Sequence, residues 1–205
     1  MGKKEKVSAN LHSQIKNLSF FIEEFSADEI YIAEHDANGT SYLLKSVDFT
    51  TNTCIIEIRQ AEGRLPKTIP FDNSKVFTIY HSGEICFIPI DGRGLKKNSC
   101  DFVFFNEQNF CFVEMKLNAT STDVRKIEDN RKKAEKQLIN TIRYFDDILA
   151  KNYAGLLLEA FIATPDTYPK EDTAFQSIKV SFLEQTHVRL FESREKRYDL
   201  TTNGH

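Results

Sequence analysis

Two acidic side chains and a lysine stand on either side of a short polar turn in the middle of the chain. Asp101 precedes the apolar segment 102–105, and after polar residues 106–109 a second apolar segment ends at Glu114 and Lys116. Apolar runs flanking a polar turn are typical of a β-hairpin. Symmetric pairing about the turn places Asp101 opposite Glu114, on the same face as Lys116, with the two acidic Cβ atoms about 5 Å apart.

This arrangement of residue types is suited to metal chemistry. Two opposed carboxylates repel each other, and one lysine offsets only part of that repulsion. Carboxylate oxygens and water are the ligands that magnesium and manganese prefer, so a divalent cation between Asp101 and Glu114 would remove the penalty. Such a metal can polarise a phosphoryl oxygen and acidify a bound water. Lys116 could then hold the attacking water and offset charge at phosphorus, which is the chemistry of phosphodiester hydrolysis.

A simpler interpretation is a surface ion pair. In that case Glu114 and Lys116 would pair on an ordinary sheet, and Asp101 would only cap its strand. An exposed pair contributes roughly 0–1 kcal/mol and needs no apolar flanks. Because both segments are apolar on both faces, they are predicted to be central strands covered on two sides, and this favours the metal interpretation.

The motif resembles that of a known superfamily. Asp101, a strand, a turn and then Glu114-Met115-Lys116 at the end of a second strand are similar to the motif of the PD-(D/E)XK nucleases, which include restriction endonucleases, Holliday-junction resolvases and repair and defence nucleases. The resemblance covers residues 84–164. It implies a restriction endonuclease-like α-β-β-β-α-β core with Mg²⁺ (or Mn²⁺) as cofactor. Asp101, Glu114 and the backbone carbonyl of Met115 would bind the metal, and Lys116 would position the nucleophile.

The resemblance implies further site residues and has one departure. Cys100 stands where the proline that names the motif is found. Many members carry a glutamate on the first core helix, for which Glu23 and Glu24 are candidates, with Glu84 before a strand as the alternative. Some members place a glutamine on the helix after the lysine strand, and Gln137 could match it.

The pattern of apolar and turn residues along the chain predicts an α/β fold. In this fold a mixed central sheet is flanked by helices and extended by antiparallel strands. Apolar spacings of three and four residues predict helices over 8–26, 123–153 and 173–185, the second capped by Ser121, Thr122 or Asp123. Strands are predicted over 29–34, 41–49, 53–60, 76–80, 85–90, 156–163 and 188–192, with turns at 36–39 and 50–52, loops at 61–74 and 91–94, and a frayed tail from Ser193.

One face of the predicted helix 123–153 is rich in basic residues. A solvated face balanced by acidic neighbours is the simpler interpretation of this pattern. Beside an acidic metal site, the same face is suited to contacting backbone phosphates without reading sequence. The basic residues are Arg125, Lys126, Arg131, Lys132, Lys133, Lys136 and Arg143, of which Lys126, Lys132, Lys133 and Lys136 are the predicted nucleic-acid contacts.

Composition limits the possible classes of protein. The 205 residues include 40% hydrophobic and 28% charged residues, enough for a sizeable core, and the net charge of −3 excludes a polycation that coats DNA. The start lacks the apolar region of a secretory signal, and no apolar run approaches the roughly 20 residues that span a bilayer. The four cysteines lack CxxC spacing and are predicted to be buried thiols, so a cytoplasmic protein without membrane contact is expected.

Two functions of different classes remain open. The first is a nuclease, endo- or exonuclease, acting on DNA, with RNA as an alternative substrate. The second is a catalytically inactive protein on the same scaffold, which binds nucleic acid or protein. We expect one nuclease-like domain over 1–205, with a core at 84–164 and a β-rich extension at 27–80. The extension is suited to substrate selection or to forming a homodimer.

Overall fold

The computed structural model of the chain describes most residues between Met1 and Tyr198. The predicted turn at 36–39 falls largely outside the described residues, and the predicted loop at 91–94 falls entirely outside them. The described ranges are 1–35, 39–60, 63–81, 83–90, 98–170 and 172–198.

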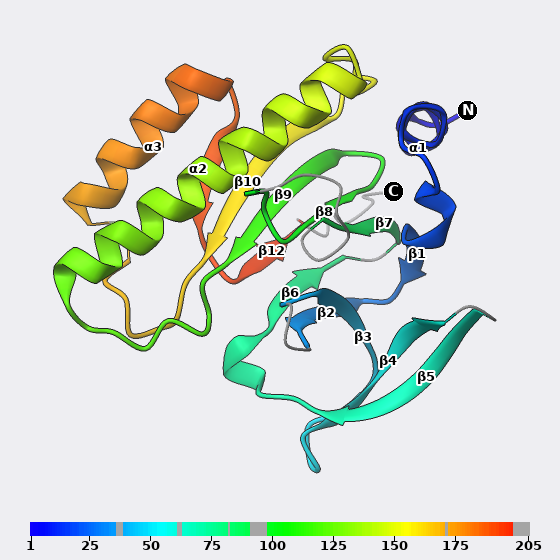
Figure 1. Ribbon diagram of the computed structural model, residues 1–205, viewed down its shortest axis with the longest axis horizontal. Helices are drawn as coiled ribbons and strands as arrows, with labels where there is room; N and C mark the ends of the chain where they lie inside the picture. Colours follow the sequence, from blue (N-terminus) through cyan, green and yellow to red (C-terminus); the bar gives the residue numbers. More distant parts are fainter. Residues whose placement is uncertain (36–38, 61–62, 82, 91–97, 171, 199–205) are drawn as a thin grey trace, which may run out of the picture.

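The described residues form three α-helices, two short 3₁₀ helices and twelve strands, and the strands make two six-stranded mixed sheets (Figure 1). The α/β class is therefore confirmed. The elements, in chain order, are α1 (Lys3–Gln14), η1 (Leu18–Phe20), β1 (Glu23–Ser26), β2 (Glu29–Glu34), β3 (Ser41–Asp48), β4 (Thr53–Gln60), β5 (Gly63–Pro70), η2 (Asn73–Lys75), β6 (Phe77–Tyr80), β7 (Glu84–Pro89), β8 (Phe102–Phe105), β9 (Asn109–Met115), α2 (Val124–Ile148), β10 (Leu157–Ala163), α3 (Thr173–Thr186), β11 (Arg189–Glu192) and β12 (Glu195–Arg197).

The first sheet has the strand order β1-β7-β8-β9-β10-β11. Neighbouring strands from β1 to β9 in this order pair antiparallel, whereas β9, β10 and β11 pair parallel to one another. Within the β8–β9 hairpin, Phe102 pairs with Val113 and Phe105 with Phe110, which is the predicted register. Every residue of β8 and β9 is buried, so the prediction of central strands covered on both faces is confirmed.

The second sheet has the strand order β12-β6-β2-β3-β4-β5. The strands from β2 to β6 come from residues 29–80, and β12 adds a parallel edge strand from the end of the described chain. The register shifts between Lys45 and Asp48 on β3, where the sheet bends into the long β4–β5 hairpin.

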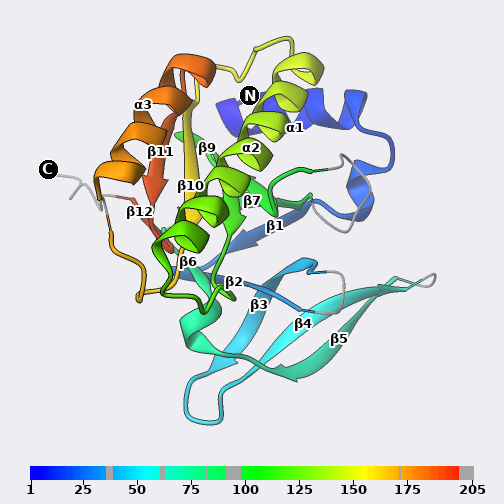
Figure 2. The ribbon, with the colours of Figure 1, turned by 60° about the vertical axis from the view of Figure 1, so that its left-hand side comes forward.

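The described helices cover one face of the first sheet, which differs from the predicted sheet flanked by helices. On the helix side, a core cluster joins Leu11 of α1, Leu138 of α2 and Phe182 of α3 to the sheet (Figure 2). On the other side the second sheet packs against the first, with Phe77 in edge contact with Phe102 at 5.7 Å between ring centroids. The order of layers is therefore helices, sheet, sheet.

The first helix begins and ends earlier than the predicted 8–26. Gly2 caps it, and its backbone N–H donates to the Glu5 carboxylate at 2.9 Å, as in a capping box. Asn17 has a left-handed backbone that stops helical continuation. Glu23 and the three residues after it are then used by β1, which pairs with β7, because tertiary pairing overrides a short helical pattern.

Two segments expected to be irregular are strands. The predicted loop at 61–74 contains β5, and its prolines Pro66 and Pro70 are tolerated because β5 is an edge strand. The tail from Ser193 contains β12, which pairs with β6 through partners such as Lys196 and Ile79. The β12 error arises from pairing with a segment distant in sequence, whereas β5 forms a local hairpin with β4 whose glycine and prolines resemble a loop.

The cysteines are buried and free, as predicted. Cys86 and Cys111 lie on strands of the first sheet, Cys100 lies just before β8, and Cys54 lies on β4 of the second sheet. Among the described helices, none combines the length and apolar character needed to cross a membrane.

Candidate functional site

The candidate site lies where the β8–β9 hairpin ends beneath α2. The β8–β9 ladder ends at the pair Phe102 and Val113, and the backbone N–H of Asp101 donates to the carbonyl oxygen of Val113 at 3.0 Å, so Asp101 lies beside the end of β9 that carries Glu114. Glu114 follows Phe112 by two residues, and Phe112 lies in the cluster on the helix side, so the Glu114 side chain points towards the helices. Both acidic residues are almost fully enclosed, with 3% of Asp101 and 1% of Glu114 exposed.

Asp101 is held by the main chain of the facing strand. The backbone N–H of Met115 donates a hydrogen bond to Oδ2 of Asp101. Burial raises the pKa of Asp101 well above its usual range, and the charge of Glu114 raises it further, while the Met115 N–H acts in the opposite direction. Keeping both carboxylates ionised is therefore costly in this site without a cation.

Lys116 connects the carboxylate pair to α2. Its ammonium group forms an ion pair with Oε1 of Glu114 and lies 3.2 Å from Oε1 of Gln137. The side-chain amide of Gln137 in turn donates to the carbonyl oxygen of Ser99 at 3.0 Å. Gln137 thus contacts both Lys116 and the segment that leads into Asp101, so the structure brings these four predicted residues together.

A second contact from α2 to the same segment escaped prediction. The backbone N–H of Cys100 donates to Oγ1 of Thr141 at 2.8 Å, and Thr141 is fully buried. Thr141 follows Gln137 by four residues, so both lie on one face of the helix. That spacing was the available signal, and together the two side chains fix the main chain before Asp101.

A third carboxylate near the site was not predicted either. Glu34 ends β2 of the second sheet, and its charge contributes to the raised pKa of Asp101. Its Oε2 atom accepts a hydrogen bond from Nδ2 of Asn118, two residues after Lys116, at 2.7 Å. No local pattern links Glu34 to the hairpin, because their proximity depends on how the two sheets pack.

Glu84 does not join these residues, contrary to the expectation drawn from its place before a strand. It begins β7, whose far end, Pro89, pairs with Phe102 beside Asp101. The strand between Glu84 and Pro89 is about 17 Å long at 3.3 Å per residue. Glu84 instead forms an ion pair with Lys4.

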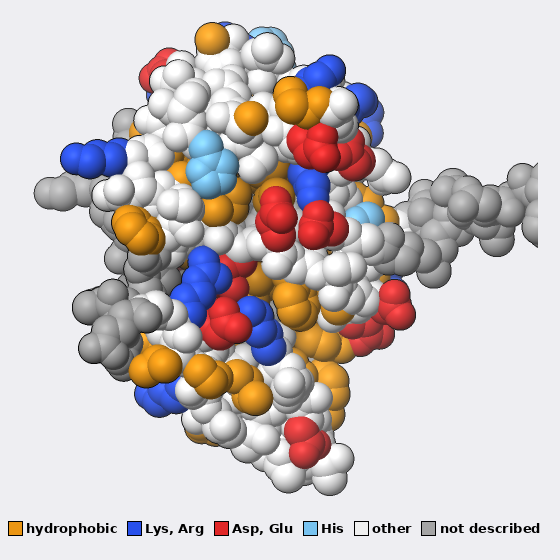
Figure 3. All heavy atoms as spheres, turned by 90° about the vertical axis from the view of Figure 1, so that its right-hand side faces the viewer, with side chains coloured by type: hydrophobic (Ala, Val, Ile, Leu, Met, Phe, Trp, Pro, Cys, Tyr) orange, Lys and Arg blue, Asp and Glu red, His pale blue; other side chains and the backbone are white. Residues whose placement is uncertain are grey.

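The other two candidate glutamates lie on β1 rather than on a helix. Glu23 forms ion pairs with Arg64 at 3.0 Å and Lys45 at 3.5 Å, and Oε1 of Glu24 accepts a contact from Sγ of Cys86 at 3.6 Å. Acidic and basic side chains lie next to each other on the face of the molecule shown in Figure 3. β1 is separated from β8 by β7, so these glutamates take part in other contacts.

The predicted basic contacts extend from α2 into solvent. Lys126, Lys132, Lys133 and Lys136 are all exposed, and Lys132 lies 3.9 Å from Glu128 in an ion pair. Positive charge is therefore available on this face but partly offset. Contact with nucleic acid stays a prediction.

Arg131 does not belong to that face, which corrects the sequence interpretation. It is 1% exposed and forms two hydrogen bonds of 2.9 Å to Glu192 and one of 2.8 Å to Asp172. Its guanidinium also lies 5.3 Å from the centre of the Phe175 ring. Arg131 thus joins α2 to β11 and to the start of α3, a structural role.

The residues at the candidate site fit a divalent metal in their chemistry. Asp101 and Glu114 offer hard oxygen ligands, and the Met115 carbonyl is adjacent in sequence. Within the described ranges, no three His, Cys, Asp or Glu side chains are grouped so as to hold a metal ion. Magnesium commonly binds through only one or two carboxylates and keeps several waters, so two carboxylates suffice for that ion.

No protein-family model, curated protein or solved structure matches the chain. What the geometry provides is a buried carboxylate pair, a lysine in contact with one of them, and an amide that holds the lysine. This arrangement lies at one end of a mixed sheet covered by helices.

Proposed function

We propose that the protein is a metal-dependent nuclease similar to the PD-(D/E)XK superfamily. The observation that carries the proposal is that Asp101 and Glu114 lie close together at the end of the β8–β9 hairpin, with Lys116 two residues after Glu114 and in contact with it. A buried pair of carboxylates is unfavourable in itself. A function that uses their charge accounts for the arrangement better than a structural role does.

The order of elements supports the same proposal. The sequence α1, β7, β8, β9, α2, β10 has the α-β-β-β-α-β order expected of a restriction endonuclease-like core. The strands β1 to β6 stand between α1 and β7, as an insertion in that order. Because one fold can host many functions, the order of elements carries less weight than the residues of the site.

Each residue has a defined part in the proposed reaction. Magnesium held by Asp101, Glu114 and the Met115 carbonyl would polarise a phosphoryl oxygen and acidify a water. Lys116 would donate a hydrogen bond to that water and offset the charge that develops on phosphorus. Gln137 would keep the Lys116 ammonium in place, since its Oε1 is 3.2 Å from Nζ. The expected substrate is DNA, with the exposed α2 lysines contacting phosphates.

Cleavage assays with matched variants test the proposal. Plasmid, single-stranded and branched DNA, and RNA, are incubated with Mg²⁺ or Mn²⁺ and the wild-type protein. We expect Glu114→Gln and Lys116→Met to lower the cleavage rate at least about 100-fold. Glu184→Gln is the control, because Glu184 is an exposed acid on α3. Equal activity of wild type and Glu114→Gln would show that any cleavage has another origin.

A catalytically inactive binding protein is the second candidate. The observation in its favour is that the Lys116 ammonium already forms an ion pair with Glu114. Calorimetric titration with MgCl₂ separates the candidates. Metal binding that Glu114→Gln abolishes supports the nuclease, whereas a folded protein that binds no metal supports the inactive scaffold.

A further inference from the structure

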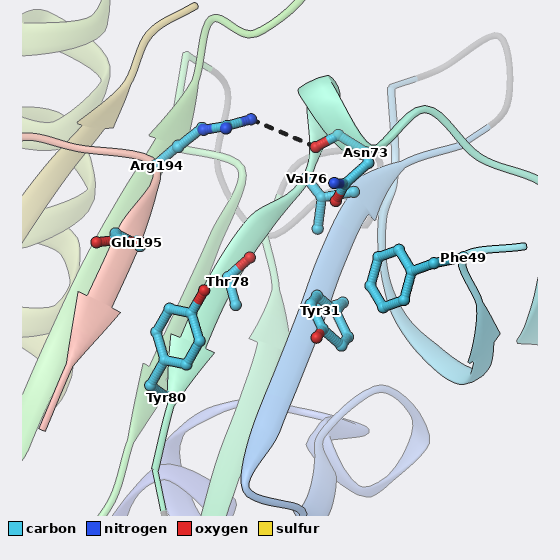
Figure 4. A pocket seen from close by; sticks show the side chains of 8 residues that line it. All are labelled: Tyr31, Phe49, Asn73, Val76, Thr78, Tyr80, Arg194 and Glu195. Carbon is cyan, nitrogen blue, oxygen red and sulfur yellow. Dashed lines mark hydrogen bonds between the residues drawn. The ribbon is translucent and has the colours of Figure 1, made fainter. Parts of the chain in front are cut away.

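A polar hollow with aromatic walls lies on the outer face of the second sheet. Its volume is about 180 Å³, which is below the roughly 300–1,000 Å³ of pockets that enclose a drug-sized ligand. It can therefore take a single ring system rather than a whole ligand of that size. The lining residues are Tyr31, Phe49, Asn73, Val76, Thr78, Tyr80, Arg194 and Glu195 (Figure 4).

Three aromatic rings come from three elements to this hollow. Tyr31 of β2 pairs with Thr78 of β6, and Tyr80 follows Thr78 by two residues, so all three share one face of the sheet. Phe49, which follows β3, lies edge-on to Tyr31 with 5.4 Å between ring centroids. Phe49 is 47% exposed, and its ring is accessible to a ligand.

Polar and cationic groups border the same rings. The guanidinium of Arg197 lies 3.9 Å from the centre of the Tyr80 ring. Arg194 borders the hollow beside Asn73 (Figure 4). Arg194 also pairs with Asp166 at 3.2 Å, and Arg197 with Glu195 at 2.8 Å. Because acidic partners offset both arginines, stacking rather than charge would supply most of the affinity.

We propose that this hollow binds an unpaired base of a single-stranded nucleic acid. Aromatic side chains stack on any base, since every base has a π-face. Thr78 and Asn73 can hydrogen-bond to a base edge, and the two arginines can contact the phosphates on either side of it. The inference rests on the proposed function, because it identifies the bound nucleic acid as the single-stranded part of a nuclease substrate.

The hollow lies near the same end of the first sheet as the candidate site. Asp166, the partner of Arg194, follows Ala163 at the end of β10 by three residues, a span of at most about 11 Å. The carbonyl oxygen of Ala163 accepts a hydrogen bond from the backbone N–H of Lys116 at 2.7 Å. The segment that follows β10 therefore joins the border of the hollow, at Asp166 and Arg194, to the end of β9 that carries the candidate site.

Fluorescence anisotropy tests the inference without metal, so that cleavage plays no part. The probe is a short fluorescein-labelled oligodeoxythymidine in EDTA buffer, compared with oligouridine and with a blunt duplex. We expect single strands to bind more tightly than the duplex, and Phe49→Ser to weaken binding about ten-fold. Phe20→Ser is the matched control, because Phe20 is similarly exposed, at 50%, but lies in η1 after α1 and does not line the hollow. Equal loss in both variants, or tighter binding of the duplex, would overturn the inference.

Two further measurements keep the test decisive if Phe49→Ser is unstable. Photo-cross-linking of wild-type protein to a bromodeoxyuridine oligonucleotide should label Tyr31, Phe49 or Tyr80, whereas labels confined to other residues contradict the hollow. The slope of log K against log salt should correspond to about two phosphates, near −1.4. A much steeper slope would assign binding to the α2 lysines.

The outcome separates this inference from the proposed function. Glu114→Gln should abolish cleavage and keep single-strand binding, because Glu114 lies outside the hollow. If single-strand binding depends on Phe49 and the protein has no nuclease activity, the inference about the hollow is supported and the nuclease proposal is contradicted. If the protein cleaves DNA and Phe49→Ser leaves binding unchanged, the nuclease proposal is supported and the inference about the hollow is contradicted.

Discussion

Nζ of Lys116 lies 3.2 Å from Oε1 of Gln137, which links the end of the β8–β9 hairpin to the middle of α2. The other end of the same amide contacts the carbonyl of Ser99 at 3.0 Å. A single side chain therefore sets both the position of the ammonium group and the path of the chain into Asp101. Residues that position a reacting group in this way commonly affect rate more than ligand affinity.

Replacing Gln137 by Met should therefore lower the cleavage rate while keeping magnesium binding. We expect a loss of about 10- to 100-fold in rate, as is usual for residues that orient a site from behind. Cleavage kinetics and magnesium titration are measured on the same preparations. Gln185→Met, at an exposed position of α3, is the control. A loss of magnesium affinity as large as that of Glu114→Gln would contradict a positioning role.

The hairpin register was predictable because it depends on local sequence. Apolar runs on both sides of Asn106–Asn109 leave one symmetric pairing, and that pairing brings Asp101 and Glu114 to the same end of the hairpin. Gln137 was proposed because the resemblance implies a glutamine on the helix after the lysine strand, and Gln137 stands next to Leu138 of the predicted core stripe. The part of the site built from adjacent segments was thus open to sequence reasoning.

Other features of the site and of the fold could not be predicted, mainly because they depend on contacts between segments distant in sequence. Glu34 reaches Asn118 only because the second sheet packs against the first. Arg131 looked like a member of a basic surface, yet Glu192, at the end of β11, makes its burial possible. The charged edge strand β12 resembles a loop sequence, and only its distant partner β6 reveals it. The edge strand β5 was missed for a local reason, because its prolines hide the hairpin that it forms with β4.

Replacing Asp101 by Asn should stabilise the metal-free protein. The change replaces a buried carboxyl, whose ionisation is costly there, by a neutral amide whose oxygen can still accept the hydrogen bond from Met115. We expect the free energy of unfolding to rise by about 1–2 kcal/mol, a Tm increase of roughly 2–8 °C, because sites that bind charged ligands are often strained without them. Thermal unfolding in EDTA buffer measures it.

Two comparisons show whether the gain comes from the carboxylate pair. Asp129→Asn, on the exposed side of α2, should leave the Tm nearly unchanged. Added Mg²⁺ should raise the Tm of wild type and not that of Asp101→Asn. If the Asp101→Asn variant were less stable than wild type in EDTA, repulsion between Asp101 and Glu114 would not be a cost of this fold.

Arg131 and Glu192 form a buried ion pair whose loss should be costly. Arg131→Met leaves the Glu192 carboxylate enclosed without its cation, and we expect a loss of about 3–5 kcal/mol in the free energy of unfolding. The double variant Arg131→Met with Glu192→Met should recover most of that loss, because it removes both charges. Urea unfolding of the three proteins gives the values. Equal losses in the single and double variants would mean that packing, not charge, accounts for the effect.

His81 should make stability depend on pH near neutrality. Burial lowers the pKa of His81 below its ordinary value of 6.5. Its Nε2 atom lies 3.3 Å from Nδ2 of Asn106, a contact that suits the neutral ring as acceptor, and its ring lies 4.6 Å from that of Tyr198. The unfolded chain therefore takes up the proton more readily than the folded one.

The sign of the effect follows from that difference. The contribution of His81 is fully present above about pH 6.5, and it is lost as the pH falls through 6.5 towards the lower folded value. We expect the free energy of unfolding to decrease by less than about 1 kcal/mol between roughly pH 7.5 and 5.5, since the ring keeps partial contact with water. Urea unfolding across this range measures the slope. His81→Gln should flatten it, and His12→Gln, at an exposed position of α1, should not; an unchanged slope in His81→Gln would assign the pH dependence to another group.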